Sequence, residues 1–185
     1  MRNLVLIGFM GAGKSVAGQA LAKRLARPCV DVDAEIEQET GRPIRRLFAE
    51  EGAPAFRQAE RAMIRRVTRQ TGQVIATGGG AVMDPENLRA LRRHGWLVWL
   101  RAAPDVILAR IGGDVDRRPL LNVADPKARI EGLLALRQAT YATADVTVET
   151  SARSMEDVVE EILRLLPAEM VPPSDGGRAA RGARG

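Results

Sequence analysis

Short strand-like segments alternate with amphipathic segments along the chain, and this alternation predicts the fold. Four of the strand-like segments are apolar throughout or nearly so, and one alternates apolar residues with aspartates; they span residues 4–7, 29–33, 74–77, 96–100 and 146–148. In the segments between them, apolar residues recur every three or four positions, the spacing of one helix face. The pattern indicates an α/β protein with a doubly wound, five-stranded parallel sheet and right-handed crossovers.

Proline, glycine and capping residues mark where the helices begin and end. Helices are expected over about residues 15–27, over 34–40, from 43 and from 54 with a break at Gly52, and from 85, 104, 126 and 155. Residues 1–166 should therefore form a single domain. From Pro167 onward Pro, Gly, Ala and Arg dominate, so residues 167–185 are expected to be a disordered tail.

Length and composition narrow the class of protein. A chain of 185 residues suits one well-buried α/β domain. No apolar run approaches the roughly 20 residues of a membrane span, and the first strand begins almost at residue 1, so we expect a cytoplasmic protein with no membrane partner. The single cysteine, Cys29, excludes an internal disulfide, disfavours a cysteine-based metal site, and is expected to be a small buried apolar residue.

The chain is basic, with a formal net charge of +5. A basic surface can indicate nucleic acid as the partner. Here the arginines are interspersed with Asp and Glu, and aromatic residues, which stack on bases, make up only 3% of the chain. We therefore expect no nucleic-acid partner, because an anionic small substrate explains the charge equally well.

The stretch from Gly8 to Ser15 matches the phosphate-binding pattern G-x-x-x-x-G-K-S/T between a predicted strand and a predicted helix. Its glycines let several backbone N–H groups point inward, and the helix N-terminus adds positive partial charge. Lys14 is expected to reach the β- and γ-phosphates of a nucleotide, and the Ser15 hydroxyl to bind Mg²⁺. The residues expected around the phosphates are Gly11, Ala12, Gly13, Lys14, Ser15 and Val16.

Two aspartates could approach the same phosphate site from the predicted strand 29–33. Asp31 and Asp33 are two residues apart, so their carboxylates would point to the same side of a strand. If that strand lies beside the first, both lie at the carboxyl ends of the strands, where ligands bind in open α/β sheets. The alternative is a solvated Asp-x-Asp turn.

Three further features can be interpreted as functional or as purely structural. Arg57 and Glu60 are three apart on a helix, which by spacing alone is an ordinary surface pair. Three glycines, 78–80, end a strand, where they indicate either a close backbone approach or only a sharp turn. Residues 112–125 contain glycines, alternating charges and little periodicity, which is typical of a mobile lid.

Taken together, residues 2–166 resemble the shikimate kinase family, P-loop small-molecule kinases similar to nucleoside monophosphate kinases. Beyond the phosphate loop no single landmark is specific, but their order and spacing are. The landmarks are Gly8 to Ser15, Asp31-Val32-Asp33, Phe56-Arg57 with Glu60, Gly78-Gly79-Gly80-Ala81-Val82, Arg118-Pro119-Leu120-Leu121, and Arg137 with Tyr141.

The resemblance implies the strand order 2-3-1-4-5 and transfer of the γ-phosphate of ATP to the 3-hydroxyl of shikimate. ATP and shikimate are then the ligands, and a monomer is the default. The substrate-binding segment falls at about residues 33–61. Arg57 and Arg137 suit the carboxylate of shikimate, and the backbone of Gly78, Gly79 and Gly80 suits its ring. Asp33 would orient the hydroxyls and accept the reacting proton.

On the nucleotide side, the resemblance implies that Lys14 and Mg²⁺ hold the phosphates. Ser15 would bind the metal directly, and Asp31 through water. Arg118, from the predicted lid, would neutralise charge on the transferred group. Arg110 and Arg153 would flank the adenine, and Glu60 would hold Arg57 in place.

The chain departs from the family pattern at two places. Gly52-Ala53-Pro54-Ala55 stands where the family usually has Gly-Glu before Phe-Arg, and Ala139 stands where proline is usual. Neither change removes a proposed catalytic group, so we expect them to affect the positioning of Arg57 and Arg137, and hence substrate affinity. Two alternatives remain open: a kinase for another hydroxylated acid such as gluconate, and a nucleotide-dependent binding or regulatory module.

Overall fold

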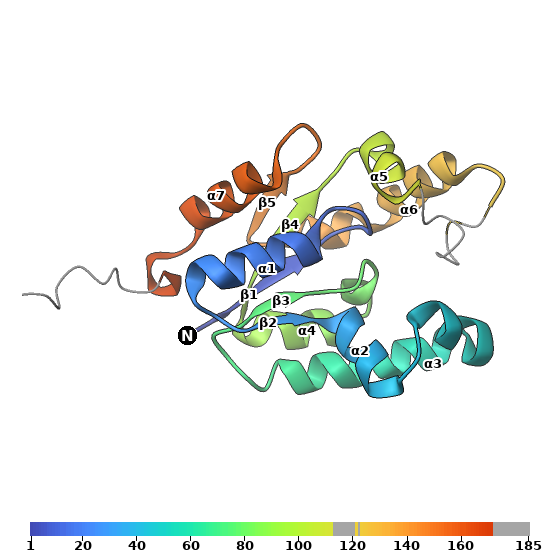
Figure 1. The fold of residues 1–185 in the computed structure, drawn as a ribbon, viewed down its shortest axis with the longest axis horizontal. Coiled ribbons are helices and arrows are strands. Elements are labelled where there is room, and N and C mark those ends of the chain that lie inside the picture. The colour runs from blue at the N-terminus through green and yellow to red at the C-terminus, as the bar shows by residue number, and fades with distance from the viewer. Residues whose placement is uncertain (113–120, 122, 172–185) are drawn as a thin grey trace, which may run out of the picture.

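A computed structural model describes residues 1–112, 121 and 123–171 of the chain. Its centre is a five-stranded sheet in the order β2-β3-β1-β4-β5, and every pair of neighbouring strands is parallel (Figure 1). The strands are β1 (Asn3–Ile7), β2 (Cys29–Asp31), β3 (Val74–Ala76), β4 (Gly95–Arg101) and β5 (Val146–Glu149). The predicted fold class and the strand order implied by the resemblance are both confirmed.

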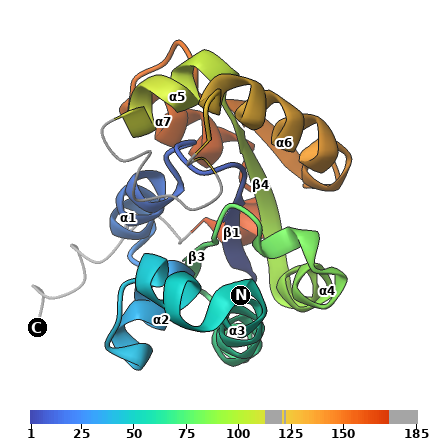
Figure 2. The ribbon, with the colours of Figure 1, turned by 90° about the vertical axis from the view of Figure 1, so that its right-hand side faces the viewer.

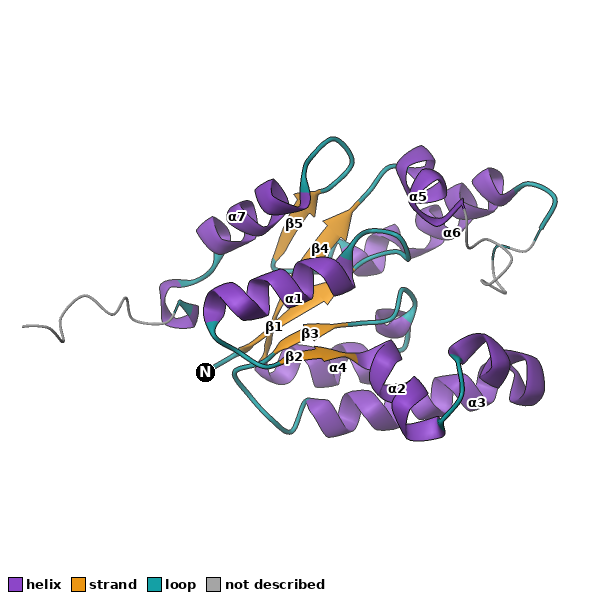
Figure 3. Ribbon diagram, viewed as in Figure 1, coloured by secondary structure: helices purple, strands orange, loops and turns teal. Residues whose placement is uncertain are grey.

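Helices cover both faces of the sheet, as Figure 3 shows, and the turned view places α1 and α4 on opposite sides (Figure 2). The α-helices are α1 (Lys14–Leu25), α2 (Val32–Thr40), α3 (Ile44–Val67), α4 (Pro85–His94), α5 (Pro104–Ile111), α6 (Pro126–Tyr141) and α7 (Met155–Leu165); short 3-10 turns are η1 (Ala81–Met83) and η3 (Ala168–Met170). Among these described helices, none combines the length and the apolar character needed to cross a bilayer.

The central strand β1 is buried over its whole length and supplies side chains to two cores. Leu4 and Leu6 belong to the core that includes residues of α1 and α7, whereas Val5 and Ile7 belong to the core under α3 and α4. Successive side chains of a strand point to opposite faces, so an unbroken apolar run is what a sheet covered on both sides requires. This rigid strand carries the phosphate-binding stretch at its carboxyl end.

The second strand is shorter than predicted, and this changes where Asp33 lies. The strand ends at Asp31, whose side chain accepts hydrogen bonds from the backbone N–H groups of Asp33 and Ala34 and so caps α2. Asp33 therefore lies in the first turn of a helix, and the prediction that both carboxylates project from one strand is wrong. Local capping by an aspartate decided the boundary over the alternating pattern.

The prediction that Cys29 is a buried apolar residue is also wrong, since its side chain is exposed. Strand β2 lies at one edge of the sheet, so part of it faces solvent. The predicted helix break at Gly52 is confirmed: Gly52 has non-helical dihedral angles (φ 82°, ψ 174°) within α3, and the helix resumes around Pro54.

Order extends further along the chain than the predicted boundary at Pro167. Residues Ala168–Met170 form a 3-10 turn, and Met170 is fully buried in the core under α1 and α7. The Met170 carbonyl also accepts a hydrogen bond from the Arg27 guanidinium. The buried Met170 side chain and the hydrogen bond from Arg27 together hold this turn against the domain. The predicted tail beyond it, residues 172–185, and most of the predicted lid at 112–125 lie outside the described residues.

Candidate active site

The phosphate-binding stretch forms a tight loop between β1 and α1 that only glycines can build. Gly8, Gly11 and Gly13 have φ angles of +137°, +76° and +93°, and a residue with a side chain would be strained in these backbone conformations. A Cβ on Gly8 would in addition overlap the carbonyl oxygen of Leu100 on the neighbouring strand β4. The loop therefore packs against the sheet and presents the N-terminus of α1, which begins at Lys14, one residue before the predicted start.

Lys14 is buried at the centre of this loop. Its ammonium donates hydrogen bonds to the carbonyls of Gly8 (2.9 Å) and Phe9 (2.8 Å), which fix the cation within the loop. Ala12 contributes only its backbone to the loop, because its methyl group is in the core. Its N–H donates a hydrogen bond to the Phe9 carbonyl. A loop of this kind binds polyphosphate through its amides and the cation together.

A cavity of about 520 Å³ opens beside the loop, and most of the predicted nucleotide-side residues line it. Val16 and Ser15 from α1, both aspartates, Gly79, and the two predicted adenine-flanking arginines are among them. The lining residues are Met10, Gly11, Gly13, Lys14, Ser15, Val16, Asp31, Asp33, Thr77, Gly79, Arg110, Arg153 and Met155. Arg118 lies outside the described residues.

The two arginines at this cavity are held by the segment that follows β5 and by α7. Arg110 donates to the Thr150 hydroxyl (3.0 Å) and the Thr150 carbonyl (2.6 Å), and Arg153 pairs with Glu161. Both arginines therefore line the cavity while their guanidinium groups already have partners in the protein, which suits stacking on a base better than pairing with a phosphate.

Asp33 faces the cavity with one oxygen inaccessible to solvent. Its Oδ1 has no hydrogen-bond partner among the described residues. Burial raises the pKa of this carboxyl to about 6, opposed by the nearby Lys14 cation and reinforced by the Asp31 carboxylate. The group is thus a carboxylate of unusual basicity, poised to take up a proton near neutral pH.

Glu60 is fully buried on α3 and binds Arg57, so the prediction of an ordinary surface pair is wrong. Arg57 Nη1 donates to Glu60 Oε2 at 2.5 Å, and Glu60 Oε1 has no partner among the described residues. Burial raises the pKa of Glu60, while the Arg57 cation lowers it. The arrangement fixes the guanidinium, as the resemblance implied.

The three glycines after β3 are required because neighbouring atoms leave no space for a side chain at these positions. None of them has a positive φ angle, so a sharp turn alone does not explain them. A Cβ on Gly78 would lie 2.7 Å from Asp33 Oδ1 and 2.9 Å from Glu60 Oε1. A Cβ on Gly79 would lie 2.9 Å from the backbone nitrogen of Met10, and one on Gly80 2.7 Å from Arg57 Nη2. Close approach is the correct interpretation of the two given above.

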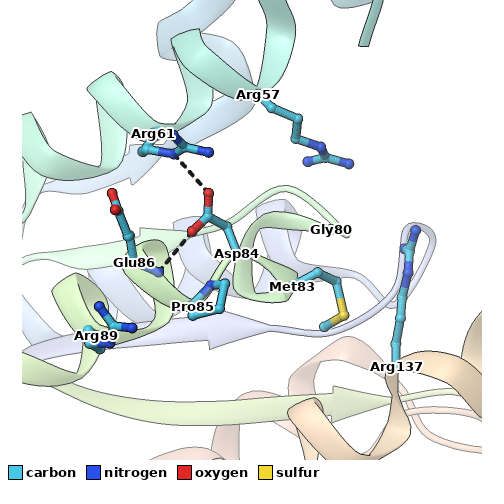
Figure 4. Close-up of a pocket in the computed structure, with 9 residues that line it drawn as sticks. All are labelled: Arg57, Arg61, Gly80, Met83, Asp84, Pro85, Glu86, Arg89 and Arg137. Atoms are coloured by element: carbon cyan, nitrogen blue, oxygen red, sulfur yellow. Dashed lines mark hydrogen bonds and ion pairs between the residues drawn. The ribbon is translucent and has the colours of Figure 1, made fainter. Parts of the chain in front are cut away.

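A second cavity of about 590 Å³ is lined by Gly80, and Arg57 and Arg137 reach into it from different helices (Figure 4). Arg137 is only 8% exposed, yet it forms no ion pair with any described carboxylate. Its guanidinium donates to the Gly79 carbonyl (3.3 Å) and lies 5.3 Å from the Phe9 ring centroid. A buried cation without a counter-ion is a strong site for an anionic ligand.

Around the two arginines, the cavity is lined by residues of α3, α4 and the turn between β3 and α4. Its remaining lining residues are Arg61, Gly80, Met83, Asp84, Pro85, Glu86 and Arg89. Asp84 caps α4 and accepts a hydrogen bond from Arg61 (2.8 Å), so this acid is already neutralised (Figure 4). Of these residues, Gly80 was predicted to lie at the ring of the acceptor and Arg61 ends the predicted substrate-binding segment; the sequence had not placed the other five near a site.

Tyr141 was used above only as a landmark, and the structure gives it a place at the site. Its hydroxyl donates to the Gly79 carbonyl, the same oxygen that Arg137 contacts. The spacing of four residues between Arg137 and Tyr141 on a helix was the available signal, because it places both on one face. Thr77 and Met155, which line the cavity beside the phosphate loop, offered no comparable signal.

Comparison with known proteins agrees with this geometry. A family model described as shikimate kinase matches residues 10–167. A curated shikimate kinase from Pseudomonas syringae pv. tomato is 49% identical over 173 residues, which is 93% of this chain and 99% of that protein. A solved shikimate kinase from Acinetobacter baumannii in complex with shikimate is 37% identical, with a TM-score of 0.86 over 89% of this chain and 92% of that one.

A more distant likeness shows the fold alone. The structure of a gluconokinase from Sinorhizobium meliloti is 18% identical to this chain, with a TM-score of 0.56, and covers 88% of this chain and 90% of that one. The same architecture therefore supports more than one acceptor, and the acceptor must be argued from the site.

Proposed function

The chain belongs to the shikimate kinase family, and from that premise we propose how its residues transfer the γ-phosphate of ATP to the 3-hydroxyl of shikimate. One observation carries the proposal. Gly79 lines the nucleotide cavity, while its carbonyl accepts a hydrogen bond from Arg137, which lines the second cavity. The two cavities therefore meet at the glycine turn, where a phosphate donor and an anionic acceptor would face each other.

Arg57 and Arg137 bind the carboxylate of shikimate. Both guanidinium groups reach into the second cavity, and planar paired donors match the geometry of a carboxylate. Arg137 has no described carboxylate to pair with, so the acceptor supplies its counter-ion. The backbone of Gly78, Gly79 and Gly80 lies against the ring, because no side chain intervenes there.

Asp33 accepts the proton as the acceptor oxygen reacts. The 3-hydroxyl oxygen forms a bond to the γ-phosphorus, the bond from that phosphorus to the oxygen it shares with the β-phosphate breaks, and the hydroxyl proton passes to Asp33. ADP and shikimate 3-phosphate are the products. With a pKa of about 6, Asp33 is mostly ionised at pH 7 and still basic enough to assist.

Lys14 and the loop amides hold the phosphates, and the residues beside them suit Mg²⁺. The Ser15 hydroxyl is exposed at the cavity, and Asp31 uses Oδ1 for capping, which leaves Oδ2 for a contact through water. Such oxygen donors are the ligands that Mg²⁺ prefers. When bound, the ion neutralises charge on the phosphates.

Three arginines complete the nucleotide side of the proposal. Arg110 and Arg153 flank the adenine, as their places on the cavity wall suggest. Arg118, which lies outside the described residues, follows the family pattern Arg-Pro-Leu-Leu and neutralises charge on the group being transferred. We also propose that the protein is a monomer, which light scattering of the purified chain tests.

An acceptor panel tests this function directly. Purified protein is assayed for ADP release with ATP and Mg²⁺ in the presence of shikimate, gluconate, a nucleoside monophosphate or no acceptor. We expect turnover that depends on shikimate. Turnover with gluconate instead would favour the other hydroxylated acid, and ATP binding without turnover on any acceptor would favour a regulatory module.

A further inference from the structure

Tyr141 is fully buried at the end of α6, one helical turn beyond Arg137. Its hydroxyl donates a hydrogen bond to the carbonyl of Gly79, and Arg137 Nη1 donates to the same oxygen at 3.3 Å. One backbone carbonyl thus joins the tyrosine to an arginine that our proposed function assigns to the acceptor's carboxylate. The inference below rests on that proposed function.

The hydrogen bond to the Gly79 carbonyl also sets the orientation of the whole Gly79–Gly80 peptide group. The peptide group is planar and trans, so the N–H of Gly80 points away from the oxygen that Tyr141 holds. Gly80 lines the acceptor cavity, and its Cα is packed so closely that a Cβ would lie 2.7 Å from Arg57 Nη2. A rotation of the Gly79–Gly80 peptide plane would therefore disturb the surroundings of both acceptor arginines.

The tyrosine is itself held rigidly. Its ring stacks on Trp99 of β4, with centroids 5.7 Å apart and planes inclined by 28°. Burial raises the pKa of the phenol, so the hydroxyl remains a donor throughout the neutral range. On the opposite side, Gly79 lies against the phosphate loop, where a Cβ would be 2.9 Å from the nitrogen of Met10. The Gly79 peptide is thus enclosed between the loop and α6.

We propose that Tyr141 is a positioning residue for the acceptor. Its hydroxyl holds the Gly79 carbonyl, and with it the Arg137 guanidinium and the Gly79–Gly80 peptide, in the arrangement that binds the carboxylate and ring of shikimate. The phenol acts only through these groups and takes no part in the transfer itself.

Tyr141→Phe tests the proposal, because it removes the hydroxyl and retains the ring on Trp99. We expect the KM for shikimate to rise about 3- to 10-fold, the effect of one net hydrogen bond, with the KM for ATP and kcat within about 2-fold of the unchanged protein. Calorimetric titration of shikimate should show the same loss of affinity.

Thr68→Val is the matched control, because the Thr68 hydroxyl likewise donates to a backbone carbonyl, that of Ile64 (2.7 Å), at the far end of α3. It should lower Tm without changing the KM for shikimate. A Tyr141→Phe enzyme that loses only Tm, with its shikimate KM unchanged, would overturn the positioning role while leaving the proposed function intact. An unmodified protein without shikimate-dependent turnover would overturn the proposed function, and this inference with it.

Discussion

Replacing Asp33 with Asn should abolish most of the activity and at the same time make the protein more stable. The carboxylate is held with Oδ1 buried and without a hydrogen-bond partner among the described residues. Burial of a charge without a partner is unfavourable, which is why the pKa of Asp33 is raised from 3.8 to about 6. The amide has the same shape and no charge to desolvate.

The magnitude follows from the pKa. A rise from 3.8 to about 6 is about two units, and each unit corresponds to about 1.4 kcal/mol between the two protonation states. The ionised carboxylate therefore destabilises the folded protein at pH 7 by up to about 3 kcal/mol. Part of the Asp33 side chain reaches solvent in the cavity, so we expect Asp33→Asn to raise the free energy of unfolding by about 1–3 kcal/mol.

The sign of the pH dependence gives an independent check. The folded state binds a proton on Asp33 more tightly than the unfolded state does, so this destabilisation is full above about pH 6 and disappears as the pH falls toward 4. The stability difference between Asp33→Asn and the unchanged protein should shrink over the same window. The kcat/KM of the unchanged enzyme should fall about 10-fold from pH 7 to pH 5.

Urea unfolding at pH 5 and pH 7 measures the stability difference, and coupled ADP release measures activity. Glu35→Gln is the control, because Glu35 lies in the same first turn of α2 and its carboxylate makes no hydrogen bond or ion pair with a described residue. It should change stability by less than about 0.5 kcal/mol. The reasoning is refuted if Asp33→Asn is less stable than the unchanged protein at pH 7, or keeps its full turnover.

Three other substitutions probe the remaining parts of the site. Arg57→Ala should raise the KM for shikimate by at least about 10-fold, because the carboxylate of shikimate loses a partner. It should also lower Tm, because Glu60 is left buried without its partner. Kinetics and thermal melts measure the two effects, and an unchanged KM would contradict the assignment of Arg57 to the carboxylate. Gly79→Ala should weaken the binding of both ATP and shikimate, because the new methyl group would meet the backbone nitrogen of Met10. Calorimetry with each substrate alone measures this, and a loss of affinity for only one of them would contradict the prediction. Arg118→Ala should lower kcat by about 10³-fold or more with the KM for ATP within about 3-fold, and undiminished single-turnover rates would exclude its assigned role.

The sequence predicted the parts of the site whose geometry is local. The phosphate loop is specified by glycines at Gly8 and Gly13 that adopt positive φ angles, a requirement that acts within a few residues. The capping residues of α4, α6 and α7 were found for the same reason, since each cap is completed within three positions of the chain. The strand order, in contrast, came from the family resemblance.

The errors share a physical cause, which is that burial depends on contacts distant in sequence. From spacing alone, Glu60 was predicted to be a surface residue. In the structure, the face of α3 that carries Glu60 points toward the turn at residues 78–80, where Gly78 approaches its carboxylate. Met170 is buried because α1 and α7 leave a place for it, and Cys29 is exposed because its strand is at an edge. Nothing within a few residues of these positions carries that information.

The most direct test of the account is to identify the phosphorylated oxygen. Purified protein is incubated with ATP, Mg²⁺ and shikimate, and the product is examined by phosphorus-to-proton correlation NMR. We predict one new phosphate ester whose phosphorus couples to the proton on carbon 3 of shikimate, with one ADP formed for each ester. An ester at another hydroxyl, or ADP formed with inorganic phosphate and no ester, would contradict the placement of the acceptor between the arginines and Asp33.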